Sequence, residues 1–520
     1  MRSTDWPRTS QKRNSSGRKR FSREACSRRV TSRKDGLAAW WKISFSTGTP
    51  GPSRKSPMGS LRSRSIRLRD TSKPVPRPPR PSSSWAPTRL PAARDQKKLT
   101  PRYGRSSMSP FTSHTLDNGL TMIFEAIPRI NSAAVGFFAN TGSRDEVPEQ
   151  AGISHFLEHM CFKGTAKRDW RQLSLDIDDL GATWNAYTWW EGTAYFHWAQ
   201  SERATQSIEI LADMMRSTIP ADEFDTEKKV ILEEIAMYHD RPDALIFDHL
   251  IRTAYPDHPV GQSVLGTEET VGALTREQMI EYFDRRYAPE NMTFIVTGRF
   301  NRDEIIAAVE DSCGDWTSGE SGRDQPNPVF SGQTRVFPRD NVTREHVTLA
   351  FPAPSAASTE AITAEMLSAY LGASTNSRLY WAVVQNSLAD EATADFAGFS
   401  DAGLIYIYLS VDPARTDEAI EVVLQECRGL HGDIDTDALG RAKTKAATSV
   451  VCAGEHGLHR FSQLVDDLSC GAPLRTLDEQ IEEIRAVNAD TIARYLSSYP
   501  LDGEPALVAL GPRTELALTH

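Results

Sequence analysis

The chain has 520 residues, of which 39% are hydrophobic and 25% are charged, which suits a globular protein with a sizeable core and allows roughly three domains. No stretch approaches the ~18 consecutive apolar residues of a membrane-spanning helix, so we expect no membrane segment. The net charge of −9 conceals a split. Residues 1–107 contain 28 basic and 5 acidic side chains, whereas residues 108–520 contain 32 basic and 64 acidic ones.

The basic segment, residues 1–107, is dominated by Arg, Ser and Pro and has no sustained apolar periodicity, so we expect it to be disordered. It fits three explanations: a nucleic-acid-binding tail, an organelle transit peptide, or an upstream reading frame translated in error before a true start at Met108. We favour the mis-assigned start, because the composition changes beside Met108. A nucleic-acid partner is therefore not expected.

Six cysteines are scattered without paired spacing: Cys26, Cys161, Cys313, Cys427, Cys452 and Cys470. This usage favours free thiols in a reducing compartment. Neither Met1 nor Met108 is followed by a secretory signal. We therefore expect a cytoplasmic protein, or one of the mitochondrial matrix if residues 1–107 are a transit peptide.

The most informative motif is a pair of histidines, His155 and His159, with Glu158 directly before the second. Residues four apart share one face of a helix, so both imidazoles can point at one cation. Glu158 lies about 100° around the helix, close enough to take a proton from a water at that cation. A structural zinc site usually has four protein ligands, and Cys161 lies on a different face. The motif therefore favours a zinc hydrolase over a structural site or a helix that merely carries histidines.

Residues 184–196 are rich in Trp, Tyr, Thr and Phe, which favours a β-strand. An open strand edge can bind an extended peptide through backbone hydrogen bonds without reading its sequence. Asn185, Ala186, Tyr187 and Thr188 are the candidate substrate-binding residues of this segment, and Asn185 could reach the peptide backbone. The aromatic side chains also suit a hydrophobic core.

Residues 225–240 show the apolar spacing of a helix, with Glu227 and Glu234 seven apart on nearly the same face. Glu234 would complete a His-His-Glu ligand set and leave a fourth position for water, the pattern of a catalytic zinc site. Glu227 could then orient or polarise the site from outside the ligand shell. The alternative is a solvated helix face.

Two stretches, residues 274–298 and 487–511, share length and pattern, since each is a predicted helix, a turn and an apolar strand that ends at glycine. We infer an internal duplication, with a linker near residues 318–332, where Gly, Ser, Asp, Asn and Pro cluster. The metal motif has no counterpart in the second half. The repeat offset puts poor zinc ligands at its positions: Ser368, Leu371, Gly372 and, for Glu234, Thr444 or Ala447.

These motifs resemble the inverzincin peptidases of the pitrilysin, insulinase and mitochondrial processing peptidase superfamily, over about residue 111 to the C-terminus. The resemblance implies one Zn²⁺ per chain, held by His155, His159 and Glu234. It also implies Glu158 as the general base and Glu227 as an additional acidic residue near the metal. Asn185 to Thr188 are similar to the start of the family's substrate-binding edge strand.

The resemblance further implies an α+β fold of two similar domains, each a mixed antiparallel sheet with packed helices, joined by a linker in a clam-shell arrangement. We expect a zinc-binding peptidase domain over residues 108–320 and an inactive homologous domain over 335–520. The second half keeps Ser377, Arg378 and Leu379 of the family pattern, but has Val384 and Asp390 about where an arginine and a tyrosine normally approach the peptide. Anchoring by that pair is therefore not expected.

The function implied is a zinc-dependent endopeptidase that hydrolyses unfolded or short peptides. Half-size members of this family commonly pair, so a homodimer or a heterodimer with a related chain is expected. The alternative is a non-catalytic partner or assembly subunit of a peptidase heterodimer, although such relatives typically lose a ligand or the base.

Overall fold

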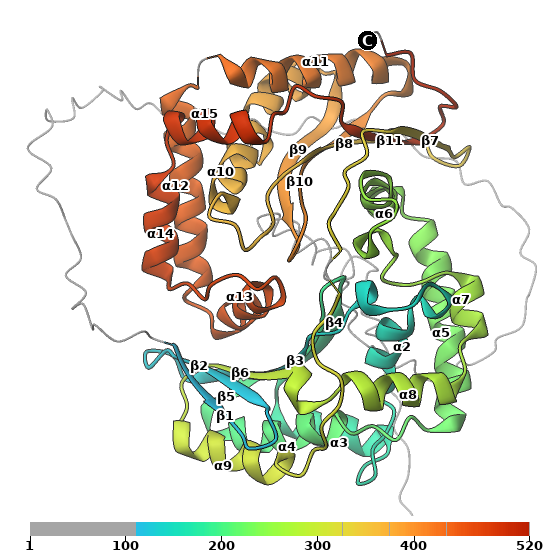
Figure 1. The fold of residues 1–520 in the computed structure, drawn as a ribbon, viewed down its shortest axis with the longest axis vertical. Helices are drawn as coiled ribbons and strands as arrows, with labels where there is room; N and C mark the ends of the chain where they lie inside the picture. Colours follow the sequence, from blue (N-terminus) through green and yellow to red (C-terminus); the bar gives the residue numbers. More distant parts are fainter. Residues whose placement is uncertain (1–110, 325, 374, 433, 519–520) are drawn as a thin grey trace, which may run out of the picture. The chain divides into compact units, whose positions relative to one another are not determined.

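A computed structural model describes residues 111–518 except 325, 374 and 433, and the prediction made for residues 1–107 lies outside this range. The described chain contains two mixed sheets (Figure 1). The first has the strand order β1-β2-β6-β3-β5-β4, and only β2 and β6 are parallel. Its strands are β1 (Phe111–Thr115), β2 (Thr121–Ala126), β3 (Ser132–Ala139), β4 (Thr183–Thr188), β5 (Thr193–Gln200) and β6 (Met292–Gly298).

The second sheet has the order β7-β11-β8-β10-β9, in which only β7 and β11 are parallel. Its strands are β7 (Thr334–Pro338), β8 (Glu345–Pro352), β9 (Ala389–Gly398), β10 (Gly403–Val411) and β11 (Ala506–Gly511). This order and these directions repeat β2-β6-β3-β5-β4 of the first sheet. The strands of the predicted duplication, β6 and β11, hold the same place, each between a parallel and an antiparallel neighbour.

Helices pack on both sheets, which confirms the predicted α+β class of two similar sheet-and-helix units. The first half contains α2 (Ile153–Met160), α3 (Trp170–Leu180), α4 (Ala204–Met214), α5 (Ala221–His239), α6 (Pro242–Ala254), α7 (Glu268–Ala273), α8 (Arg276–Arg286) and α9 (Arg302–Cys313). The second half contains α10 (Ala361–Gly372), α11 (Thr416–Arg428), α12 (Thr436–Ala453), α13 (Gly457–Ser469), α14 (Leu477–Ala486) and α15 (Ala489–Ser498). Between α9 and β7, where the linker is predicted, the described residues form neither helix nor strand.

Local sequence explains where several helices begin and end. Thr275 caps the N-terminus of α8, and Asn488 caps that of α15, each by accepting a hydrogen bond from a backbone N–H of the first turn. Asp169 does the same for α3, which ends where Gly181 adopts a left-handed conformation with φ of 60°. These end signals fix the helices that flank the sheets.

The two halves exchange one helix each (Figure 1). Helix α6 packs on β8 and β11 of the second sheet, whereas α13 packs on β3 and β6 of the first. Ile246 and Leu250 of α6 are buried with Val508 of β11, and Phe461 of α13 is buried with Ile295 of β6. Because helices cover both faces, inner strands such as β3 and β11 are apolar along their length rather than alternating.

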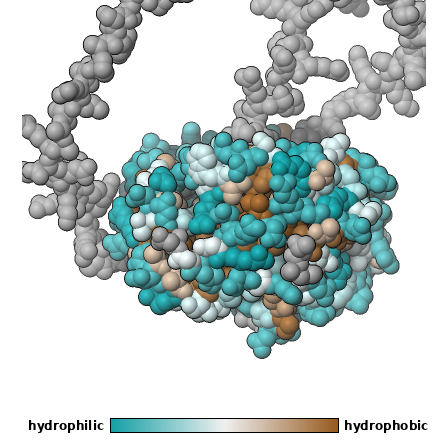
Figure 2. All heavy atoms as spheres, turned by 90° about the horizontal axis from the view of Figure 1, so that it is seen from above, coloured by the Kyte–Doolittle hydropathy of each residue, from teal (hydrophilic) through white to brown (hydrophobic). Residues whose placement is uncertain are grey.

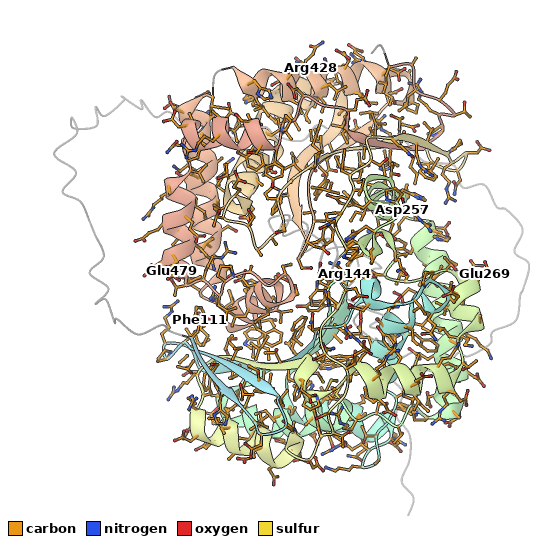
Figure 3. All side chains as sticks on the ribbon, in the orientation of Figure 1. Phe111, Arg144, Asp257, Glu269, Arg428 and Glu479 are labelled. Carbon is orange, nitrogen blue, oxygen red and sulfur yellow. The ribbon has the colours of Figure 1, made fainter. Side chains whose placement is uncertain are left out.

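Buried ion pairs also join the halves. Arg460 of α13 is fully buried and donates from Nε to both carboxylate oxygens of Glu125 on β2, at 3.0 and 2.9 Å. Burial raises the pKa of Glu125, against the opposing effect of the Arg460 charge. At a second contact, Arg144 (Figure 3) donates to Asp401 at 2.5 and 3.0 Å and to Glu191 at 2.7 Å. The halves are thus held by charged contacts as well as apolar ones.

On the surface seen in Figure 2, hydrophilic residues predominate and hydrophobic ones are exposed in small groups. Among the described residues, no helix has the length and hydropathy that a membrane crossing requires. All five described cysteines are free thiols, as their spacing predicts, and Cys26 lies outside the described range.

We predict that Arg460→Leu lowers the free energy of unfolding by about 3–5 kcal/mol, because it leaves the Glu125 carboxyl buried without its partner. The double variant Glu125→Leu with Arg460→Leu should recover much of this loss, since no unpaired charge remains. Urea unfolding of the two single variants and the double variant measures both effects. A double variant no more stable than Arg460→Leu would contradict this account of the ion pair.

Candidate metal centre

Helix α2 carries the predicted histidine pair, and it spans the predicted motif. It begins after Gly152, which has φ of 95°, a conformation that favours glycine. His155 and Glu158 are buried, whereas His159 is half-buried. Helix α5, which spans the second predicted segment, packs beside α2 and brings Glu227 and Glu234 to it.

Three predicted ligands converge between α2 and α5. His155 Nε2 lies 3.6 Å from Glu234 Oε1, and His159 Nε2 lies 3.8 Å from Glu234 Oε2. One ligand atom of each of the three residues lies within 4.8 Å of the others. Among the described residues this is the one such group of three or more histidine, cysteine or acidic side chains. The His-His-Glu set is therefore assembled by the fold.

The contacts suit a cation better than direct hydrogen bonds. Separations of 3.6 and 3.8 Å are too long for hydrogen bonds, and the buried Glu234 Oε1 has no hydrogen-bond partner among the described residues. Ligands about 2.0–2.2 Å from a tetrahedral zinc lie about 3.3–3.5 Å apart, close to the spacing seen here. Two imidazoles and one carboxylate also match the donor set of a catalytic zinc site.

The charge balance points the same way. Burial raises the pKa of Glu234 to about 7, with the His159 charge opposing this rise and the Glu158 and Glu227 charges adding to it. Burial also holds the pKa of His155 well below its usual value, so this imidazole is neutral and able to bind a metal. The His159 charge compensates an ionised Glu234 only in part, and a divalent cation would supply further positive charge. The residues present therefore fit zinc.

Glu227 contacts the site from the side away from Glu234. Its Oε1 lies 2.8 Å from His159 Nδ1, which leaves Nε2 of that ring directed toward Glu234. Its Oε2 lies 2.6 Å from Lys163 Nζ. Burial favours the neutral form of Glu227, but the hydrogen bonds with His159 and Lys163 outweigh it and lower the pKa of this carboxyl. An ionised carboxylate that orients a ligating imidazole is a common partner of zinc-binding histidines.

Thr188 holds the carboxyl of Glu158. Thr188 Oγ1 donates to Glu158 Oε2 at 2.6 Å. Burial raises the pKa of Glu158, while the neighbouring His159 charge and the hydrogen bonds with Thr188 oppose the rise. A buried carboxyl with a raised pKa beside a metal site is suited to accept and release a proton.

The predicted strand over residues 184–196 is a hairpin rather than one strand. Strands β4 and β5 pair antiparallel, and the turn between them carries Gly192. Strand β4 ends the strand order of the first sheet and packs beside α2, so Asn185, Ala186, Tyr187 and Thr188 lie on an edge strand next to the ligands. Ala186, Tyr187 and Thr188 are buried, and Asn185 is half-buried.

The second half places other side chains at the corresponding elements. Ser368, Leu371 and Gly372 lie on α10, and Thr444 and Ala447 lie on α12, which packs against α10 as α5 packs against α2. Arg378, which the sequence pattern retains, pairs with Glu426 at 2.8 Å. Asp390 is exposed and pairs with Arg344 at 2.5 Å. The described residues of the second half therefore form no second metal centre.

Comparison with known proteins places this site in a family. The family model described as Insulinase (Peptidase family M16) matches residues 121–268, and the Peptidase M16 inactive domain model matches residues 273–446. An uncharacterised zinc protease of Bacillus subtilis, YmxG, is 31% identical over 383 residues, which cover 73% of this chain and 93% of that relative. This chain belongs to the M16 family of peptidases. An uncharacterised zinc protease of Rickettsia felis is 29% identical over 385 residues, covering 74% and 93%.

Solved M16-like structures have the same fold. A protease from Helicobacter pylori gives a TM-score of 0.72 at 22% identity, covering 77% of this chain and 98% of that one. An M16 inactive-domain protein from Pseudomonas fluorescens gives a TM-score of 0.72 at 16% identity, and the match covers 78% of this chain and 99% of that one. These matches show the fold, whereas the family model and the names of the M16 relatives support a function of the zinc peptidase type.

Sequence reasoning missed two contacts of this M16 site. Lys163 lies four residues after His159, so its position near Glu227 has a helical-spacing signal, although α2 ends at Met160. Thr188 is a predicted substrate-binding residue, and its hydroxyl also contacts Glu158. No local spacing signals that second contact, because it joins residues 30 apart on different elements.

We predict that Glu227→Gln weakens zinc binding about 10–100-fold, because His159 loses its ionised hydrogen-bond partner. The matched control is Glu233→Gln, which removes an exposed carboxylate from the same helix without touching the ligands. Competition against a chromophoric chelator measures both affinities. Equal affinities in the two variants would show that Glu227 does not tune the site.

Proposed function

We propose that this chain is a zinc-dependent endopeptidase that cleaves peptide bonds of unfolded or short peptides. The observation that carries the proposal is the convergence of His155, His159 and Glu234 beside the buried carboxyl of Glu158. The names of its M16 relatives, which are uncharacterised zinc proteases, support the same class of activity.

His155, His159 and Glu234 would hold one zinc ion per chain. Three protein ligands leave a coordination position open, which is the pattern of catalytic rather than structural zinc. When bound, zinc polarises a substrate carbonyl and makes a water molecule more acidic. Glu227 keeps the His159 ring in the tautomer whose Nε2 is free to bind, because the carboxylate accepts a hydrogen bond from Nδ1–H.

Glu158 acts as the proton carrier. Its buried carboxylate accepts a proton from the attacking water and then gives it to the leaving amine of the cleaved peptide. Thr188 holds the carboxylate beside the ligands, and its hydroxyl donates to Oε2 at 2.6 Å. The pKa of Glu158 is raised above its usual value, which suits a group that both accepts and releases a proton.

The substrate would bind along β4. Among the described residues, this strand pairs with β5 alone, and an extended peptide can add to its other edge through backbone hydrogen bonds. Recognition of this kind depends on the backbone, so it favours unfolded or short peptides over folded proteins. Pairing of the chain with itself or with a related chain, and a cytoplasmic location, stay predictions.

We expect Glu158→Gln to retain zinc and to lose peptide hydrolysis by about 10²–10⁴-fold, because glutamine cannot accept the proton. His159→Ala should lose both zinc and hydrolysis. Metal analysis of the purified proteins, combined with digestion of a peptide mixture with and without chelator, separates the two effects. Wild-type protein that binds zinc and cleaves no peptide would favour a non-catalytic partner subunit instead.

We also expect Thr188→Val to lower kcat about 10–100-fold at unchanged zinc content, because a hydrogen bond to a charged group contributes about 1.5–3 kcal/mol. Thr188→Ser keeps the hydroxyl and should retain most of the activity. Thr183→Val, an exposed change on the same strand, serves as the control. If the Val and Ser variants at position 188 had equal kcat, the hydroxyl would have no part in holding Glu158.

A further inference from the structure

The loop before α2 contains a buried acidic residue that the reaction does not use. Glu146 follows a short 3-10 turn, Ser143–Asp145, and its side chain contacts the start of α2. Its Oε2 accepts a hydrogen bond from the backbone N–H of Gly152, and its Oε1 accepts one from the backbone N–H of Ser154, both at 2.7 Å. The carboxyl is 5% exposed.

These two hydrogen bonds replace a cap that α2 lacks. The first amides of a helix have no acceptor within the helix, and a side chain of the capping residue usually supplies one. The capping residue of α2 is Gly152, which has no side chain to do so. A carboxylate is also favoured at this end, because the helix dipole places partial positive charge there. Glu146 therefore caps the metal-ligand helix from a separate segment.

Glycine is required at the start of α2 by close packing. A Cβ at Gly152 would lie 2.6 Å from the carbonyl oxygen of Leu265, and φ there is 95°. The close approach that excludes a capping side chain thus leaves the cap to Glu146. Gly152 and Glu146 together therefore form the N-terminal cap of this eight-residue helix.

Glu146 is itself fixed from several directions. Its backbone carbonyl accepts a hydrogen bond from Gln262 Nε2 at 3.2 Å, and the Gln262 carbonyl accepts one from the Trp190 indole at 3.0 Å. Ser154, whose amide Glu146 binds, also shares a hydrogen bond at 2.8 Å with the hydroxyl of Tyr282 on α8. The carboxyl therefore joins α2 to a loop that is itself held by further hydrogen bonds.

The two contacts fit an ionised carboxylate. Burial raises the pKa of Glu146, while the hydrogen bonds from Ser154 and Gly152 oppose this rise. Both oxygens accept hydrogen bonds from backbone N–H groups, and such contacts favour the ionised form.

The position of α2 determines whether its imidazoles reach Glu234. His155 directly follows Ser154, and both histidines lie on this short helix, whereas Glu234 lies on α5. We infer that Glu146 is a positioning residue of the metal centre: by capping α2 it sets the helix at the place where His155 and His159 bind one cation together with Glu234. This inference rests on the zinc site proposed above.

The test compares Glu146→Gln with Glu345→Gln. Glu345 is also a buried carboxylate that accepts a backbone hydrogen bond, from Arg513 at 3.1 Å, but it lies on β8 of the second sheet. Zinc affinity of the full chain is measured by competition with a chromophoric chelator, alongside the visible absorption spectrum of the Co²⁺-loaded protein. Thermal unfolding shows how much stability each variant has lost.

We expect Glu146→Gln to weaken zinc binding about 10–100-fold and to alter the Co²⁺ spectrum, because the glutamine NH₂ group faces a backbone N–H and cannot accept from it. Glu345→Gln should lose stability without either change. Glu146→Asp keeps the charge on a shorter side chain, so it should show an intermediate loss of zinc affinity. If the glutamine variant does not fold, the aspartate variant replaces it in the test.

The outcomes separate this inference from the proposed function. If both Glu146 variants have the zinc affinity and the Co²⁺ spectrum of the wild-type protein, the positioning role is overturned and the zinc site stands. Wild-type protein without measurable zinc affinity would overturn the zinc site, and the positioning role with it. Equal loss of affinity in Glu146→Gln and Glu345→Gln would also overturn the positioning role, because it would trace the effect to stability alone.

Discussion

The structure of the candidate site depends on the packing of α2 against α5. This contact buries the Glu234 carboxyl next to two imidazoles at 3.6 and 3.8 Å, with no hydrogen-bond partner for Oε1 among the described residues. Burying an ionised carboxylate without a compensating charge is costly. A bound divalent cation would offset this cost, so the arrangement suits a metal site. Glu227, Lys163 and Thr188 then hold the surrounding groups in place.

The exchange of helices between the halves gives this site its frame. Helix α6 follows α5 in the chain and covers the second sheet, whereas α13 covers the first sheet and buries Arg460 against Glu125. Near the candidate metal centre, the loop before α2 makes two different contacts from residues two positions apart. Arg144 joins it to Asp401 of the second half, and Glu146 joins it to the start of α2. One loop thus touches both the inter-half contact and the helix that carries the ligands.

The interpretation of individual elements from sequence varied in quality for physical reasons. The helix over residues 225–240 and the histidine helix were predicted correctly, because amphipathic spacing is a local property of the chain. Residues 184–196 were read as one strand because Trp, Tyr and Thr favour strands on both sides of the turn at residues 189–192. The duplication was visible at β6 and β11, since their apolar sequences end at matching glycines.

By itself, the sequence determined the spacing of the candidate metal ligands and of the candidate base, because residues one or two turns apart on a helix share a face whatever the fold around them. It also determined the helix, turn and strand that residues 274–298 and 487–511 repeat. Only the tertiary structure decided that Glu234 meets the imidazoles and that Thr188 holds Glu158. It also decided that Glu146 caps α2, by accepting from amides six and eight residues later in the chain. These contacts join separate elements, and they depend on packing that no local pattern encodes.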